Sequence, residues 1–419
     1  MKAVFVVALM MFAMMIKSED ETNPPYQEPI LDNENDVNFP GPNPENTATE
    51  QVECPQYAHE QFITDYYEYL KTHKKAYKCE DFRLRYFLYA ERRKAIEEFN
   101  RRSDVTYVQG TNALTDLTDE ERSRRYLGIP DNDPDNHTEY ERDTGSDAEI
   151  EQDIENEARQ AAQDAFTANI FNIEIFRPAL LSFDFLCCLT NPFGVPCKKD
   201  WQTLGKVTSV KNQLSCGSCW AFAAIAAMES GYLINYATSL NLSEQELVSC
   251  ATAAWGNYGC GGGWPHKALD YIITKRILKE IYFPYTASNS PCPLIFPPVY
   301  KYPAKSKTMI LPQNRMDTFL QALNQRPIAV AFKVTSGFYS YSSGIYDPSF
   351  DVACSTPGIN HAVLAVGYSL GCKPYIRFKN SWGTSFGESG YFRMKLSKTI
   401  FQDGPCQLIN HPYNVYPKV

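Results

Sequence analysis

The sequence predicts an α+β fold in more than one domain, and three observations lead to this expectation. Helical periodicity runs through residues 57–100, an apolar helix-favouring segment follows Cys219, and two strand-like segments, 362–368 and 374–379, flank a turn. The chain has 419 residues with 44% hydrophobic and 13% aromatic content, enough to bury large cores. This composition disfavours disordered, collagen-like and simple coiled-coil proteins.

The formal net charge is −9, which argues against a general nucleic-acid binder that needs a basic face. One segment supplies the negative sign, because residues 131–159 hold twelve acidic residues against two basic ones. We therefore expect a solvated segment there rather than an acidic binding surface on the main domain.

Residues 1–18 have the pattern of a secretory signal peptide, with Lys2 before an apolar run at 3–16 and polar residues after it. The run is short for a bilayer span, so we expect a cleaved signal rather than an anchor. The chain has 13 cysteines, many for a cytosolic enzyme, and the odd number leaves at least one thiol outside intramolecular pairs. The secretory pathway is therefore the expected route.

Residues 19–55 are rich in Pro, Asn and Glu and are expected to form a flexible leader, and residues 56–128 a small helical domain. Apolar residues at helical spacing suggest two helices, with the stripes Phe62, Tyr66 and Leu70, and Leu84, Leu88, Ala95 and Phe99. Residues 129–194 are expected to be an acidic linker or insertion, with a polar helix as one option for 149–166.

The second helix carries a row of residues at spacings of four, four, three, four and four, which places them on one face. The row consists of Asp81, Arg85, Tyr89, Arg92, Ile96 and Asn100. An ordinary amphipathic surface would also explain it. Shortly after the helix comes a second motif, with Gly110, Asn112, Leu114 and Asp116.

The strongest signal in the chain is Cys216-Gly217-Ser218-Cys219-Trp220, which has the spacing of a cysteine-protease nucleophile motif. The following residues favour a buried helix that begins near Ser218, so Cys219 would lie at a helix N-terminus that favours its thiolate. A redox cysteine pair, half of a metal site and an inert buried Cys219 are the alternatives.

A nucleophilic cysteine needs a base, and His266, His361 and His411 are the candidates after residue 195. The strands 362–368 and 374–379 form a hairpin if the chain turns between residues 370 and 371. In that register His361 lies opposite Asn380, whose amide would orient the imidazole. A core histidine is the simpler interpretation of the other two.

These motifs together resemble those of papain-like cysteine proteases, over residues 195–419 and in the helical domain. The two earlier motifs are similar to the "ERFNIN" and "GNFD" motifs of cathepsin L-like inhibitory prodomains, although Arg92 stands for an Asn and Leu114 for a Phe. The resemblance implies a papain-like fold, with a helical left half and an antiparallel, β-barrel-like right half. It also implies that Cys219 is the nucleophile, His361 the general acid/base and Asn380 its orienter, while Gln213 helps to form an oxyanion hole.

The same resemblance implies further roles, and no cofactor or metal is expected. It implies the disulfides Cys216–Cys260, Cys250–Cys292 and Cys354–Cys406. Cys54 and Cys79 could pair with each other, whereas Cys187, Cys188, Cys197 and Cys372 have no assigned partners. Substrate would contact Gly262, Gly263, Trp264, Pro265, Ala331, Ile359 and Trp382, with an apolar pocket for the second residue before the scissile bond. His411 is placed at the floor of that pocket.

Two departures lie near the expected cleft: Leu214 stands where relatives have Gly, and Phe386 where they have Trp. The expected function is therefore that of a cysteine endopeptidase zymogen, secreted or endolysosomal. It would be a monomer that acts on peptides and proteins and is inhibited by its own prodomain. Acid is expected to release the prodomain, with Asp81 and Asp116 as candidate triggers. The alternative is a catalytically silent papain-like binding or scaffold protein.

Overall fold

The structure is a computed structural model, and it divides the chain into two units, Met1–Thr49 and Glu50–Val419. The residues that it describes all lie in the second unit. They are 61–130, 193–293, 299–310, 315–351, 354, 358–396, 405–408 and 415–419. The expected signal peptide, leader, most of the acidic linker and His411 therefore lie outside the described residues.

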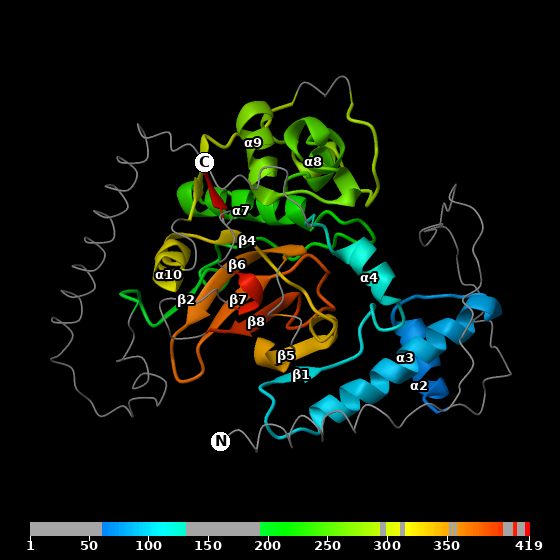
Figure 1. Cartoon of the computed structure of the whole chain (residues 1–419). Coiled ribbons are helices and arrows are strands. Elements are labelled where there is room, and N and C mark those ends of the chain that lie inside the picture. The colour runs from blue at the N-terminus through cyan, green and yellow to red at the C-terminus, as the bar shows by residue number, and fades with distance from the viewer. Residues whose placement is uncertain are drawn as a thin grey trace, which may run out of the picture. The chain divides into compact units, whose positions relative to one another are not determined.

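The first described segment forms the two helices expected of a small helical domain, together with a short strand and a third helix (Figure 1). Its elements are α2 (Ile63–Thr72), α3 (Cys79–Asn100), β1 (Tyr107–Gln109) and α4 (Asp119–Tyr126). Helix α4 begins with a capping box, in which Thr118 and Glu121 each bond the other's backbone N–H. The capping box therefore fixes where α4 begins, and the segment after α4 runs toward Cys219.

Helices α2 and α3 pack through aromatic rings. The predicted stripe Tyr66 and Leu70 is buried, but the second stripe is wrong, because Leu84 is 50% exposed. Helix α3 instead buries Phe82, Tyr86, Tyr89 and Ile96. The rings of Tyr66 and Tyr89 lie 5.0 Å apart, so the large aromatic side chains define the buried face rather than the aliphatic ones.

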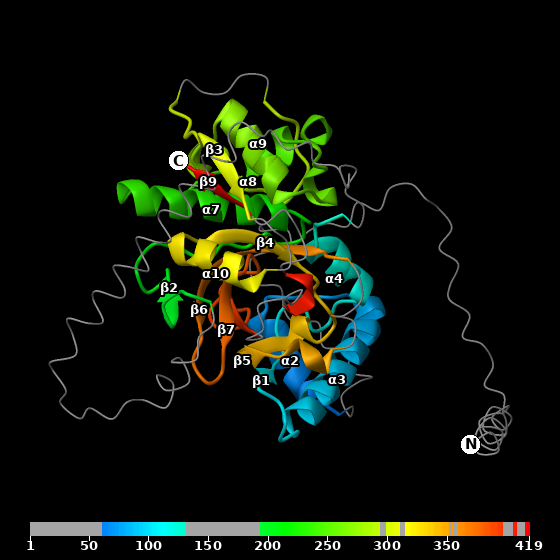
Figure 2. The ribbon, with the colours of Figure 1, turned by 60° about the vertical axis from the view of Figure 1, so that its left-hand side comes forward.

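The helical half of the main domain surrounds one buried helix. Its helices are α7 (Cys219–Tyr236), α8 (Glu244–Cys250) and α9 (Pro265–Lys275), with short helices η2 (Ala253–Trp255), η3 (Gly259–Gly261) and η4 (Glu280–Tyr282). Helix α7 is buried from Cys219 to Tyr232, as its apolar sequence predicts. It contacts α8 and α9 on one side and strand β6 on the other, so it lies between the two halves (Figure 2).

In the described part of the chain, the other half is built on one nine-stranded sheet with the order β1-β5-β8-β7-β6-β4-β9-β3, and β2 also pairs with β6. The remaining strands are β2 (Lys198–Asp200), β3 (Ser306–Met309), β4 (Ile328–Phe332), β5 (Tyr341–Tyr346), β6 (His361–Ser369), β7 (Tyr375–Lys379), β8 (Tyr391–Lys395) and β9 (Val415–Lys418). Helix α10 (Met316–Gln325) and the short helices η5 (Phe338–Ser340), η6 (Pro348–Phe350) and η8 (Pro405–Gln407) complete it. The pairs are antiparallel except β5 with β8, and β1 of the first domain extends the sheet beside β5.

The hairpin β6–β7 is confirmed, but its predicted register is wrong. Leu364 pairs with Lys379 and Ser369 with Tyr375, so the turn is centred near Cys372 rather than between residues 370 and 371. The register also shifts between Ala365 and Gly367, where a bulge adds a residue to β6. Neither the wider turn nor the bulge can be read from the alternation of side chains.

Disulfides cross-link the described cysteines. The structure contains the bonds Cys216–Cys260, Cys250–Cys292 and Cys354–Cys406. Cys79, Cys197 and Cys372 are also disulfide-bonded. Among the described cysteines, Cys219 alone is a free thiol. In the same part of the chain, no helix is both long and apolar enough to cross a membrane.

Candidate active site

Cys219 is the first residue of helix α7, with Ser218 as the N-cap residue, as the sequence predicts. The thiol is fully buried, and this burial raises the pKa of Cys219 to about 12. Main-chain groups of Ala362 and Gly128 lie against the sulfur and lower the pKa in part. The expectation of a thiolate is therefore wrong for this covered state, because desolvation outweighs the favourable helix end.

His361 and Asn380 meet beside Cys219, at the start of β6 and just after the end of β7. Both are buried, and Nε2 of His361 lies 2.8 Å from Oδ1 of Asn380. An amide oxygen only accepts, so Nε2 carries the hydrogen of the neutral ring and Nδ1 keeps its lone pair. Nδ1 has no hydrogen bond of good geometry among the residues that the structure describes, although the main chain of Tyr126 lies against the ring and raises its pKa in part. Burial lowers the pKa of His361 to about 4, although the Asn380 contact opposes this shift.

Aromatic rings cover this pair of residues. The ring of Trp382 lies 4.8 Å from that of His361, and Tyr339 stacks on Trp382 at 5.6 Å. Phe386 meets the indole edge-to-face at 4.8 Å and is buried. The smaller ring at position 386 is therefore accommodated within an aromatic cluster that keeps water from the histidine and its amide partner.

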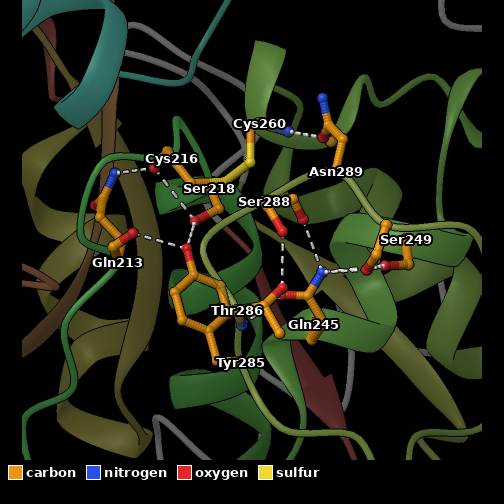
Figure 3. The surroundings of a disulfide bond; sticks show 12 residues. Gln213, Cys216, Ser218, Gln245, Ser249, Cys260, Tyr285, Thr286, Ser288 and Asn289 are labelled. Carbon is orange, nitrogen blue, oxygen red and sulfur yellow. Dashed lines mark hydrogen bonds between the residues drawn. A yellow bond between two sulfur atoms is a disulfide. The ribbon is translucent and has the colours of Figure 1, made fainter. Parts of the chain in front are cut away.

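Gln213 lies on the loop before α7, and its side chain is fully buried and held at both ends. Its Oε1 accepts a hydrogen bond of 2.7 Å from the hydroxyl of Ser381. Its Nε2 donates to the carbonyl of Cys216 at 2.9 Å and to that of Tyr126 at 3.2 Å. The amide N–H group of Gln213 therefore faces the same chain segment that covers Cys219 (Figure 3 shows the loop from Gln213 to Ser218).

The segment after α4 lies across Cys219. The N–H groups of Gly128 and Ile129 both donate to the carbonyl of Asn360, at 3.0 and 3.1 Å. The carbonyl of Gly128 accepts a 2.8 Å hydrogen bond from the N–H of Gly263. Main-chain atoms of the first domain thus form hydrogen bonds with both walls of the cleft and cover the thiol.

An apolar pocket receives Ile129, the next residue of that segment. Ile129 belongs to one buried cluster with Trp264, Ala331 and Ile359, all at most 6% exposed. Pro265 is buried as the first residue of α9, and Gly262 adopts a positive φ of 116° beside the cleft. Of the residues expected to line this pocket, Trp264, Ala331 and Ile359 share one buried cluster with Ile129, whereas His411 lies outside the described residues.

Polar contacts stabilise the first domain internally and attach it to the main domain. Asp116 is fully buried, forms an ion pair with Lys75 and accepts a 2.9 Å hydrogen bond from Tyr69. Asp81, the other candidate acid trigger, is instead exposed at the start of α3. Asn112 donates to the carbonyl of Tyr339 at 2.6 Å and so links the second motif to the main domain.

The departure at Arg92 is compensated within the same domain. The Arg92 guanidinium donates to the carbonyls of Thr115 and Leu117 and forms a 2.9 Å ion pair with Asp119. Arg85 forms a bidentate ion pair with Glu121, one of whose bonds is 2.8 Å long. An arginine can therefore fasten α3 to the loop after it, as a neutral amide donor would.

Sequence reasoning missed several residues of this site. Gly128 and Tyr126 were placed at the end of the helical domain without a role, and Ser381 and Tyr285 were not singled out. Ser381 could have been found, because it directly follows Asn380. Nothing in the local pattern marks Tyr285, which reaches the site from 66 residues beyond Cys219.

A free thiol at a helix start, beside a histidine–amide pair and under a separate helical domain, defines a thiol peptidase held as a proenzyme. Comparison with known families agrees: residues 195–415 match the papain family cysteine protease model, and residues 66–122 match the cathepsin propeptide inhibitor domain. The chain belongs to the papain family of cysteine proteases and carries a cathepsin-type propeptide. The fold class and the family expected from the sequence are thus confirmed.

Individual relatives match most of the chain. The chain is 32% identical to cysteine proteinase 3 of Solanum lycopersicum over 80% of each chain. It is 34% identical to a cathepsin L-like proteinase of Fasciola hepatica, over 78% of this chain and 87% of that one. Among solved structures, a recombinant stem bromelain precursor has a TM-score of 0.63 at 29% identity, covering 85% of this chain and 99% of its own.

Proposed function

We propose that this zymogen yields an endopeptidase in which Cys219 is the nucleophile and His361 the general acid and base. Asn380 would fix the tautomer of the imidazole, and Gln213 would stabilise the oxyanion together with the N–H of Cys219. The observation that carries the proposal is the course of the prodomain segment, whose backbone lies on Cys219 between Asn360 and Gly263. A peptide backbone is therefore what this cleft holds.

The reaction follows from the chemistry of these groups. The Cys219 thiol gives its proton to Nδ1 of His361, and the sulfur attacks the substrate carbonyl carbon. The carbonyl oxygen becomes an oxyanion that accepts hydrogen bonds from Nε2 of Gln213 and the N–H of Cys219. The imidazolium then protonates the departing amine, which leaves a thioester. Water hydrolyses this thioester with His361 as the base, and the free thiol returns.

The second residue before the scissile bond is proposed to be apolar. Ile129 fills the cluster formed with Trp264, Ala331 and Ile359, so this pocket favours aliphatic or aromatic side chains. Gly263 would pair with the substrate main chain as it now pairs with Gly128. The segment between Cys260 and Cys292 holds no added insertion that would close the cleft at one end, which favours an endopeptidase.

The proenzyme is proposed to be inactive for two reasons. The prodomain covers the cleft, and the buried thiol and imidazole are both neutral, with pKa values near 12 and 4. Removal of the prodomain would rehydrate the pair and allow proton transfer from Cys219 to His361.

Further assignments also remain proposals. The domains are proposed as a signal peptide at 1–18, a leader at 19–55, an inhibitory prodomain at 56–128, a linker at 129–194 and a peptidase at 195–419. A disulfide-bonded proenzyme is consistent with the secretory pathway. We place the mature enzyme in the extracellular space or an acidic organelle, as a monomer acting on peptides and proteins.

The test is turnover of a fluorogenic dipeptide reporter by the acid-activated full-length chain in the presence of a reductant. Turnover with an apolar second residue, lost in Cys219→Ala and reduced with an acidic second residue, is expected. Absence of turnover after verified prodomain removal would overturn the proposal and favour a silent binding protein.

A further inference from the structure

Tyr285 connects the two chain segments that carry the proposed oxyanion donors. We propose that Tyr285 is a positioning residue, which fixes Gln213 relative to the start of helix α7. This inference rests on the proposed function, because it concerns how the same site stabilises the oxyanion. Tyr285 itself lies outside the cleft and acts through these two neighbours.

The Tyr285 hydroxyl makes two short hydrogen bonds (Figure 3). It donates to the main-chain carbonyl of Gln213 at 2.7 Å and lies 2.7 Å from the hydroxyl of Ser218. The Ser218 hydroxyl also lies 3.4 Å from the carbonyl of Cys216. Because the phenol gives its one hydrogen to the carbonyl of Gln213, and the contact with Tyr285 is the shorter of the two that Ser218 makes, we assign Ser218 as the donor to Tyr285.

The two partners of the Tyr285 hydroxyl connect this hydrogen-bond chain to the oxyanion site. Gln213 supplies one proposed oxyanion donor from its side chain, and Ser218 directly precedes Cys219, whose N–H is the other. The hydroxyl of Ser218 is not used to cap α7. A single phenol oxygen thus spans the two elements whose separation sets the distance between the donors, and such preorganisation is what oxyanion stabilisation requires.

The Tyr285 side chain is itself held rigidly. Its ring meets that of Phe222 edge-to-face at 4.9 Å, with an interplanar angle of 89°. Its N–H donates to Oε1 of Glu280 at 2.7 Å, and the N–H of Thr286 donates to Oε1 of Gln245 at 2.9 Å. Burial also raises the pKa of Tyr285, so the phenol stays protonated and remains a donor.

The Gln213 loop needs such a restraint. The next residue, Leu214, is a non-glycine residue with a φ of 52°, in the left-handed region that costs free energy. Its side chain is 50% exposed, so little packing opposes relaxation of the loop. Two main-chain bonds hold Gln213: its N–H donates to the carbonyl of Ser381 at 2.8 Å, and its carbonyl accepts from Tyr285. Loss of the second would free the main-chain carbonyl of Gln213 and leave only the N–H bond and the side-chain bonds to Ser381 and Cys216 to position this residue.

The first experiment compares activated Tyr285→Phe enzyme with the wild type on a reporter peptide. The variant keeps the ring against Phe222 and removes the hydroxyl. We expect kcat/KM to fall about tenfold through kcat, with little change in KM, because the lost restraint matters most in the transition state. Tyr282→Phe is the matched control, because Tyr282 lies on the same loop and is 47% exposed. It should retain wild-type kcat/KM.

The second experiment separates oxyanion stabilisation from nucleophile reactivity. A peptide aldehyde forms a hemithioacetal whose oxygen needs the oxyanion donors, whereas alkylation of Cys219 by chloroacetamide does not. Tyr285→Phe should weaken aldehyde binding about tenfold and leave the alkylation rate and its pH profile unchanged. Equal loss of both, or of neither, would overturn the positioning role.

A third measurement shows whether the loss in Tyr285→Phe comes from the hydrogen-bond chain or from a misfolded variant. Ser218→Ala removes the other end of the hydrogen-bond chain and should give a smaller loss of kcat/KM with the same selective effect on the aldehyde. In the double variant the two losses should be less than multiplicative, because both act through the same phenol. Fully multiplicative effects would contradict the proposal. Wild-type enzyme that is inactive, or as active as Cys219→Ala, would refute the proposed function itself rather than this inference.

Discussion

The backbone of Gly128 lies against the sulfur of Cys219. A Cβ atom built on Gly128 would lie 3.2 Å from that sulfur and only 2.0 Å from the carbonyl oxygen of Gly217. Glycine is thus required here by the close approach of two segments of the chain, not by its backbone angles. The prodomain covers the nucleophile with a segment that has no side chain at the point of contact.

Gly128→Ala should therefore weaken the hold of the prodomain on the cleft. The added methyl group would force the segment away from Gly217 and break its bonds to Asn360 and Gly263. We expect the full-length proenzyme to hydrolyse the reporter at neutral pH at least about tenfold faster than wild type, as a cost of about 1.4 kcal/mol would produce. Gly110→Ala is the control, since its Cβ would meet only the Ser342 side chain, at 3.3 Å. Unchanged latency in Gly128→Ala would contradict the close contact.

The buried ion pair of Asp116 with Lys75 gives a second prediction. Asp116→Asn would leave the Lys75 ammonium, whose side chain is 15% exposed, without its charge partner. Breaking such a pair typically costs about 3 kcal/mol, so the prodomain should unfold more easily and be processed faster at neutral pH. Asp81→Asn is the matched control, because Asp81 is exposed on the same domain. Processing is followed by gel after mixing each proenzyme with a trace of active enzyme, and equal rates for both variants would refute the role of Asp116.

Acid should release the prodomain partly through His361. Its pKa is about 4 in the covered state against 6.5 for a free imidazole, so the covered state takes up the proton later than an uncovered one. The covered state is therefore most stable above about pH 6.5 and should lose stability as pH falls toward 4. Glu121 responds at lower pH: burial would raise its pKa, but Arg85 and the Thr118 N–H lower it to about 2, so its contribution to the folded prodomain is lost only between about pH 4.5 and about pH 2.

Hydrogen exchange of the Gly128 N–H measures the stability of the covered state at each pH, because this N–H donates to the carbonyl of Asn360 in that state. In a Cys219→Ala proenzyme, protection corrected for intrinsic exchange should fall between about pH 6.5 and about pH 4. Adding His361→Gln, which cannot protonate, should flatten this dependence. The same slope in both proteins would assign the acid response to carboxylates alone.

Local sequence patterns predicted some parts of this structure well, for identifiable physical reasons. Helix α7 was predictable because apolar residues all round a helix require burial, and Cys219 fell at its start for the same reason. The strands β6 and β7 were predictable from their apolar runs. His361 and Asn380 meet, as expected, even though the register used to derive that meeting was wrong.

Other parts depend on contacts between segments far apart in the chain. The buried face of α3 follows from tyrosines that pack on Tyr66, and aliphatic periodicity does not show it. Burial raises the pKa of Cys219, and the groups that lie against the sulfur and partly oppose this rise belong to Gly128 and Ala362, 91 residues before it and 143 after it. No local motif contains such information, so the charge state of the thiol required the structure.

Leu214 gives the last prediction, which concerns stability. Its φ of 52° lies where glycine is favoured, and its side chain is half exposed. Leu214→Gly should therefore stabilise the protein by about 1 kcal/mol and raise Tm by about 2–4 °C. Leu214→Ala should leave Tm nearly unchanged, because alanine meets the same backbone penalty. Ala237→Gly, at a φ of 51° after α7, should give a similar gain away from the cleft. A lower Tm for Leu214→Gly alone would mean that the Leu214 side chain contributes more packing than its backbone angle costs.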